Sequence, residues 1–266
     1  MRKGKGVQPP GGMEAEQYAV MARREERHWW YAGMRHSALA LLATGLPGGQ
    51  PLDILDAGCG TGGTTVELRR FGRVFGVDLA EEALRPAAGR GLAGCLARGT
   101  IERLPFGSAT VDVVTSFEVV YHLAVGDDRR ALAELRRVLR PGGVLLLRVP
   151  AHDWLRGEHD RLVHTRHRYG RHEVAAKLAE AGFLVEHLSW ANSLLFLPAA
   201  AKRLLERWTG SRAGAASPPT GEPDLWQPPG PVNALLQGVV GVEAVALSRG
   251  IPLPWGLSLV ALARAR

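Results

Sequence analysis

Short apolar segments alternate with amphipathic helical segments along most of this 266-residue chain. The apolar segments are continuous, which is typical of strands that are buried on both faces of a sheet. Because helices must cover those faces, the pattern predicts an α/β domain built on a parallel sheet. The predicted strands are residues 52–56, 73–78, 111–116, 144–149, 183–189 and 256–265, and the predicted helices between them are residues 61–71, 80–89, 127–139 and 171–181.

Composition distinguishes several further segments outside this alternating region. Glycine, proline and basic residues predict a disordered tail at 1–12, and a long helical segment at 13–46 ends at Pro47-Gly48-Gly49. Helices are expected at 193–208 and 232–248, with a loop rich in Gly, Pro and Ser between them. The predicted organisation is a tail at 1–12, a helical lid at 13–50, a core at 51–190, a helical insertion or cap at 191–250 and a final core strand at 251–266.

Charge and cysteine content restrict the class of protein. Apolar residues make up 46% of the chain and charged residues 22%, which is a globular composition. The net charge of +7 indicates either attraction to phosphate, nucleic acid or an anionic membrane, or arginines spread over surface helices. The arginines mostly stand beside Glu and Asp, which favours the second interpretation.

Two cysteines, Cys59 and Cys95, exclude a disulfide scaffold and predict a cytoplasmic location. No transmembrane span is expected, since the apolar stretch 234–247 is too short.

A glycine-rich turn follows the first predicted strand, at Ala57-Gly58-Cys59-Gly60-Thr61-Gly62-Gly63, and opens a helix. Without Cβ atoms the backbone can approach a ligand closely, and a helix N-terminus offers free N–H groups. Asp78 ends the next predicted strand, where a carboxylate can accept hydrogen bonds from both hydroxyls of a ribose. The pair predicts a cofactor that carries a nucleoside. The spacing is G-x-G-x-G, and not the G-x-G-x-x-G of dinucleotide-binding folds.

Five stretches in this order resemble the class I S-adenosylmethionine-dependent methyltransferases of the small-molecule type. They are residues 55–62 (LDAGCGTG), 76–79 (GVDL), 101–106 (IERLPF), 111–123 (VDVVTSFEVVYHL) and 139–143 (LRPGG). The resemblance implies a Rossmann-like, seven-stranded, mostly parallel sheet with helices on both faces and an antiparallel last strand, to which the helical insertion is added. It also implies S-adenosyl-L-methionine as the cofactor.

The resemblance assigns the cofactor-binding roles. Asp78 is expected to hold the ribose, and Leu79 to lie against the adenine. The turn is expected to hold the methionine end of the cofactor through Asp56, Gly58, Cys59, Gly60, Thr61 and Gly62.

The third and fourth motifs complete the expected cofactor site. Ile101 should meet the adenine, while Phe117 and Glu118 should border the transferred methyl group. Related proteins usually carry Asp where Thr100 stands and bind the adenine amino group with it. Here either Thr100 accepts that hydrogen bond or Glu102 takes its place.

Methyl transfer from a sulfonium is a direct displacement, so the protein has to align the acceptor and can also deprotonate it. The candidate bases are His122, His152 and His159. His122 lies in a motif that reads E-x-x-E-H in some metal-binding relatives, but Tyr121 replaces the second Glu, so no metal is expected. His122 is then either a structural histidine or a residue at the edge of the substrate.

His152 and His159 belong to the segment 151–169, which follows the fifth predicted strand and is crowded with charged and aromatic residues. Such a loop at the active edge of an α/β sheet is either a solvated surface or the acceptor site. We interpret it as the acceptor site, with His152 or His159 as the base. At the other end of the chain, His28-Trp29-Trp30-Tyr31 either packs on the sheet or forms the lid over the cofactor.

The acceptor is less well defined by the sequence. After the fourth strand the chain reads Ser116-Phe117-Glu118-Val119, and not the Asp/Asn-Pro-Pro-Tyr/Phe of nucleic-acid amino methyltransferases, so nucleic acid is not an expected partner. The expected helix 232–248 is apolar on nearly every face, and 193–208 begins with four apolar residues and ends with basic ones. These helices pack on the domain, cap an apolar acceptor pocket, form a dimer face or rest on a membrane surface.

The leading hypothesis is a methyltransferase that acts on a small-molecule or lipid-like acceptor at oxygen, in an oligomeric state that the sequence leaves open. One alternative is a catalytically silent, methyltransferase-like binding protein at an anionic membrane surface, in keeping with the basic charge and the apolar insertion. The other is a nicotinamide-dependent oxidoreductase, a class that lacks the antiparallel pair expected of the last two strands.

Overall fold

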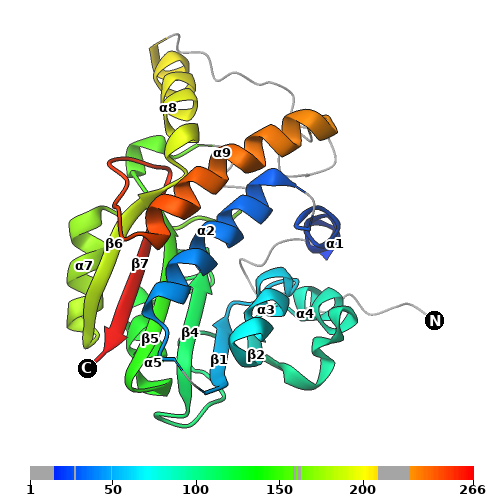
Figure 1. The fold of residues 1–266 in the computed structure, drawn as a ribbon, viewed down its shortest axis with the longest axis vertical. Helices are drawn as coiled ribbons and strands as arrows, with labels where there is room; N and C mark the ends of the chain where they lie inside the picture. The colour runs from blue at the N-terminus through cyan, green and yellow to red at the C-terminus, as the bar shows by residue number, and fades with distance from the viewer. Residues whose placement is uncertain (1–14, 27, 49, 158–159, 161–162, 209–227) are drawn as a thin grey trace.

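The computed structural model describes residues 15–26, 28–48, 50–157, 160, 163–208 and 228–266 (Figure 1). The expected tail at 1–12 and the candidate base His159 therefore lie outside the described residues.

One seven-stranded sheet forms the centre of the molecule, in the order β3-β2-β1-β4-β5-β7-β6. The pairings among β1 to β5 are parallel, and β7 lies antiparallel between β5 and β6. The expected mostly parallel sheet with an antiparallel last strand is confirmed. The strands are β1 (Leu52–Ala57), β2 (Gly72–Asp78), β3 (Leu96–Arg98), β4 (Val111–Phe117), β5 (Leu139–Pro150), β6 (Phe183–Ala191) and β7 (Ser258–Ala265).

Helices cover both faces of this sheet, and α2 and α9 lie side by side in front of it in Figure 1. On the opposite face, α5 packs on β5 and α7 on β6. The helices are α1 (Ala15–Arg24), α2 (Trp29–Gly45), α3 (Gly63–Leu68), α4 (Glu81–Ala87), α5 (Asp128–Val138), α7 (Arg171–Glu180), α8 (Ser193–Trp208) and α9 (Gly230–Ser248). The short helical turns are η1 (Arg69–Phe71), η2 (Ala88–Leu92), η3 (Ala93–Cys95) and η4 (Asp153–Leu155).

The hydrophobic core has two parts because successive strand residues point to opposite faces of the sheet. Ile54 belongs to the cluster with α2 and α9, whereas Leu55 belongs to the cluster with α5 and α7. In the same way Val260 faces α2, and its neighbour Leu259 faces the other side. Burial on both faces explains why these strands read as continuous apolar runs.

Many boundaries differ from the sequence prediction by a few residues, and three differences are larger. The single helix expected at 13–46 is two helices, and His28 caps the second by accepting a hydrogen bond at Nδ1 from the Trp30 N–H, 3.2 Å away. The three-residue strand β3 was not predicted from the sequence, because so short an edge strand shows no periodicity. The strand expected at 144–149 begins earlier, since Leu139 already pairs with Val111 before the Pro-Gly-Gly irregularity.

Helix α9 has 19 residues and is longer than the apolar stretch considered in the sequence. By length and composition alone it could cross a membrane, so the expectation that this stretch is too short was wrong. In the fold it is a packed helix. Its Glu243 is buried and accepts hydrogen bonds from the N–H groups of Asn192 and Leu194, at 2.8 and 3.2 Å.

The contact between α2 and α9 depends on Gly33. A Cβ atom there would lie 2.7 Å from Cγ1 of Val240, well inside van der Waals contact. We expect Gly33→Ala to lower the free energy of unfolding by about 1–2 kcal/mol, because the cost of overpacking exceeds the gain in helix propensity. Gly238→Ala on α9 is the matched control, since nothing lies within 4 Å of its added Cβ. Urea unfolding should show the control unchanged or more stable, and equal effects of the two variants would contradict this packing.

Candidate active site

A cavity of about 530 Å³ opens where β1, β2, β4 and β5 end. This carboxyl edge is where open α/β sheets bind their ligands. Residues of α1 and α2 close one side of the cavity, namely Tyr18, Met21, Trp30, Tyr31 and Met34. The expected lid segment thus lines the same cavity as the glycine turn, although its opening and closing stay a prediction.

The turn after β1 has a backbone that only glycine readily adopts. Gly58, Gly60 and Gly62 have φ angles of 88°, 53° and 84°. A Cβ on Gly58 would lie 2.1 Å from Cγ2 of Val119, and one on Gly62 would lie 2.9 Å from Cδ1 of Leu92. Conformation and packing therefore both require glycine. Gly58, Cys59 and Gly60 line the cavity with their backbone.

Asp78 at the end of β2 ties this turn to the next strand. Its Oδ2 accepts a hydrogen bond from the Gly60 N–H and its Oδ1 one from the Ala80 N–H, both at 2.9 Å. Burial raises the pKa of Asp78, while these N–H groups act in the opposite direction. The carboxylate lines the cavity, and each oxygen keeps a lone pair for a further donor such as a ribose hydroxyl. The turn and Asp78 therefore fit S-adenosyl-L-methionine.

Asp56 supports the turn from β1. Its oxygens accept hydrogen bonds from the hydroxyls of Thr65, at 2.6 Å, and Thr115, at 2.8 Å. Burial raises the pKa of Asp56 to about 6. Asp56 is 2% exposed and also borders the cavity. Its observed role is to support the turn, and its contact with the cofactor remains a prediction.

The expected adenine site is only partly assembled. Leu79, Thr100 and Ile101 line the cavity. Glu102 does not, because its carboxylate accepts hydrogen bonds from the N–H groups of Gly126 and Asp127, each at 3.1 Å. The structure thus places Glu102 at the loop before α5, and of the two alternatives it favours Thr100.

Thr61 and Gly62 are the other expected cofactor residues that do not line the cavity. The Thr61 hydroxyl donates to Oε1 of Glu25, at 2.7 Å, and Arg90 donates to the same oxygen at 2.7 Å. Glu25 is buried and lines the cavity next to the turn. This contact joins the segment after α1 to the cofactor turn and was not predicted, because the two lie 36 residues apart in sequence.

The other half of the cavity contains ionised groups. Glu118 follows β4 with a φ of 60° and pairs with Arg148 of β5, whose Nε lies 2.9 Å from Oε1. The Arg148 guanidinium also lies over the ring of Phe117, 5.2 Å from its centroid. Burial, together with the nearby Glu118 carboxylate, raises the pKa of the Tyr121 hydroxyl. Phe117 and Glu118 thus lie in the cavity, as expected, but Arg148 was missed although a basic residue inside the apolar run VLLLRV was its signal.

Comparisons with known proteins agree with this geometry. Residues 55–147 match a family model described as a methyltransferase domain. A probable S-adenosylmethionine-dependent methyltransferase of Mycolicibacterium smegmatis is 36% identical over 138 residues, which is 50% of this chain and 52% of that protein. A malonyl-[acyl-carrier protein] O-methyltransferase of Pectobacterium atrosepticum is 41% identical over 115 residues, 42% of this chain and 43% of the relative. The chain therefore matches about half the length of these relatives.

Residues 55–147 of this chain are therefore similar to a methyltransferase domain, and half of the chain is similar to a protein described as a probable S-adenosylmethionine-dependent methyltransferase. Solved structures share its fold at lower identity. An S-adenosylmethionine-dependent methyltransferase of Thermotoga maritima, a possible histamine N-methyltransferase, gives a TM-score of 0.57 at 17% identity and covers 94% of this chain and 96% of its own. One from Mesorhizobium loti gives 0.52 at 20% identity, covering 85% and 96%.

The segment after β5 contributes an ion pair to the cavity. Arg168 Nε lies 2.7 Å from Oδ1 of Asp160, which is 2% exposed, and Arg168 also donates to the carbonyl of Ala151 at 3.0 Å. Both side chains line the cavity with Thr165. Asp160 and Arg168 were not among the candidate bases, and the acceptor role of the segment 151–169 stays a prediction.

The two candidate histidines that the structure describes occupy different environments. His122 lines the cavity, and its Nδ1 accepts a hydrogen bond from the Ala124 N–H at 3.1 Å. Burial, helped by nearby His164, lowers the pKa of His122 to about 4. The ring is therefore neutral at pH 7 with its proton on Nε2, and it can donate a hydrogen bond from there.

His152 does not line the cavity. Its ring stacks on Trp190 at 4.5 Å between centroids, and Phe196 and Trp154 lie near it. Burial lowers its pKa. The structure places this candidate base in an aromatic cluster, so its catalytic role stays a prediction without support from its position.

The low pKa of His122 makes stability depend on pH. An unfolded histidine binds a proton near pH 6.5, whereas folded His122 does so only near pH 4, so folding loses stability as the pH falls through this interval. Between pH 7 and pH 5 the loss attributable to His122 should be about 2 kcal/mol. We expect His122→Gln to reduce the difference between the unfolding free energies at the two pH values by this amount. An unchanged difference would show that His122 titrates normally.

Proposed function

We propose that this chain transfers the methyl group of S-adenosyl-L-methionine to an oxygen at the polar end of a small-molecule or lipid-like acceptor. The observation that carries the proposal is that one cavity joins the glycine turn and Asp78 to the charged groups Glu118, Arg148 and Arg168. The first half suits a nucleoside and the second a polar acceptor.

The cofactor, when bound, supplies an electrophilic methyl group on a sulfonium. The protein has to place the acceptor oxygen in line with it and exclude water. In the proposed arrangement Asp78 accepts from the ribose, Gly58 and Gly60 leave room for the methionine end, and Phe117 with Glu118 borders the methyl group.

Glu118 is the side chain best placed to receive a proton from an acceptor hydroxyl. It lines the cavity beside Phe117, and its ion pair with Arg148 fixes its orientation. His122 is less suited to this role at neutral pH, because its Nδ1 already accepts a hydrogen bond and its Nε2 carries the proton. We propose instead that His122 donates a hydrogen bond from Nε2 to the acceptor.

Transfer to oxygen is also supported by the relatives described as malonyl-[acyl-carrier protein] O-methyltransferases, which match about two fifths of this chain. The oxidoreductase alternative is disfavoured because β7 lies antiparallel between β5 and β6, a pairing that class lacks. The silent binding protein is disfavoured because the glycine turn and Asp78 keep the geometry that a nucleoside needs.

Calorimetry with S-adenosylhomocysteine tests the cofactor half of the proposal. We expect the wild type to bind and Asp78→Ala to bind at least about tenfold more weakly, since hydrogen bonds to a charged group contribute about 1.5–3 kcal/mol. Glu102→Gln is the matched control, because this carboxylate lies outside the cavity and should leave the affinity unchanged. The proposal fails if the wild type does not bind. Equal binding by Asp78→Ala would refute the role given to this residue.

A further inference from the structure

Exposed apolar side chains gather on α8 and α9. On α8, Leu197 is 64% exposed and Leu204 58%, and Trp208 at the end of the helix is 87% exposed. On α9, Leu235 is 67% and Val242 68% exposed. We call Leu194, Leu197, Leu204, Trp208, Leu235 and Val242 the α8–α9 patch. Several large apolar side chains exposed on two neighbouring helices are more than the single exposed residues that are ordinary on a protein surface, and they point to an interaction site.

The spacing of these residues shows that each helix presents one apolar stripe. Leu194, Leu197, Leu204 and Trp208 are separated by three, seven and four residues, which keeps them on one face of a helix. On α9, Leu235 and Val242 lie seven residues apart, and they face away from Val240 and Glu243, which are buried. The outward stripe is thus separate from the side by which α9 is attached to α2.

The outward side of α9 carries no negative charge. Glu243 is its only carboxylate, and it is buried and bonded to backbone N–H groups. Arg249, directly after α9, is exposed, and the sequence of α8 contains Lys202, Arg203 and Arg207 against one Glu206. The whole chain has a net charge of +7. A negatively charged surface is therefore complementary to this end of the molecule.

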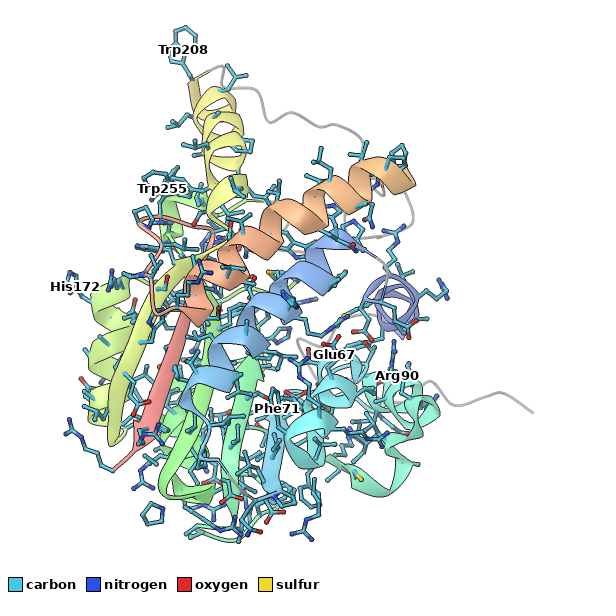
Figure 2. All side chains as sticks on the ribbon, in the orientation of Figure 1. Glu67, Phe71, Arg90, His172, Trp208 and Trp255 are labelled. Carbon is cyan, nitrogen blue, oxygen red and sulfur yellow. The ribbon has the colours of Figure 1, made fainter. Side chains whose placement is uncertain are left out.

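Tryptophans lie at the limits of the same region. Figure 2 shows Trp208 at the outer end of α8, away from the body of the domain, and Trp255 near the inner end of that helix. Trp255 is 46% exposed. Tryptophan is enriched where one end of a side chain meets hydrocarbon and the other meets water, as at the surface of a bilayer.

We propose that the α8–α9 patch docks this protein on the surface of an anionic lipid bilayer. Apolar stripes with tryptophan, near basic residues and without an exposed carboxylate on α9, are typical of helices that lie in the membrane interface. Two copies of a chain with a net charge of +7 repel each other, which makes an anionic surface the better partner.

The patch lies next to the cavity, because Ala199 of α8 lines it, between Leu197 and Leu204 in sequence. The acceptor side of the cavity contains the charged groups Arg148, Glu118, Asp160 and Arg168, which suit a polar group, beside apolar residues such as Leu155 and Leu257. It follows, resting on the proposed function, that the acceptor is an amphipathic lipid whose polar head group enters the cavity from the bilayer.

Co-sedimentation with vesicles tests the docking surface without cofactor or acceptor. The probes are vesicles of phosphatidylcholine alone and of phosphatidylcholine mixed with phosphatidylglycerol. We expect the wild type to sediment with the mixed vesicles, less at high salt and less with phosphatidylcholine alone. The double variant Leu197→Glu/Leu235→Glu should lower the partition coefficient by about tenfold or more, because two inserted leucines become charged. Leu184→Glu on β6 is the matched control, since this leucine is 47% exposed but outside the patch, and it should behave as the wild type.

Circular dichroism and S-adenosylhomocysteine calorimetry on the same samples show whether the variants fold and whether the cofactor site is intact. The docking proposal is overturned if the wild type does not bind mixed vesicles, or if the double variant and Leu184→Glu bind them equally. It is also overturned if light scattering shows a dimer that the double variant disrupts while vesicle binding is absent. Failure to bind S-adenosylhomocysteine with normal vesicle binding would instead overturn the proposed function alone.

Discussion

The hydrogen bond between the Asp78 carboxylate and the Gly60 N–H holds the functional edge of the sheet together. It connects the turn after β1 to the end of β2, and the N–H groups of Gly58 and Cys59 reinforce it by donating to the Val77 carbonyl at 2.7 and 3.0 Å. The turn can adopt this path because its glycines tolerate positive φ angles. The same carboxylate faces the cavity, so the group that shapes the turn is also available to a nucleoside.

Around this edge, segments far apart in the sequence supply the remaining surfaces. Glu25, after α1, reaches Thr61 in the turn, and Arg90 holds both. On the acceptor side the Glu118–Arg148 and Asp160–Arg168 pairs bring opposite charges to a largely buried site. Arginine can be retained there because each guanidinium meets a carboxylate, whereas an unpaired charge would be costly to bury.

In the proposed arrangement, the cavity carries out the methyl transfer and the outward faces of α8 and α9 attach the protein to a surface. The charged cavity suits the polar end of an acceptor, while the apolar side chains of α8 and α9 face outward. A lipid tunnel would have required those side chains to point inward. In the proposed arrangement the same segment, inserted between β6 and β7, places the domain at a surface without altering the sheet that is expected to hold the cofactor.

The sequence by itself determined the layered sheet, its antiparallel last strand, the glycine turn and the place of Asp78, because these depend on local periodicity and on short motifs with fixed spacing. Only the tertiary structure decided which charged residues share the cavity. Arg148, Asp160 and Arg168 come together from different elements, whereas Glu102 bonds a loop and His152 stacks on Trp190. Sequence spacing within one segment cannot specify such contacts, since they depend on how separate elements pack against one another.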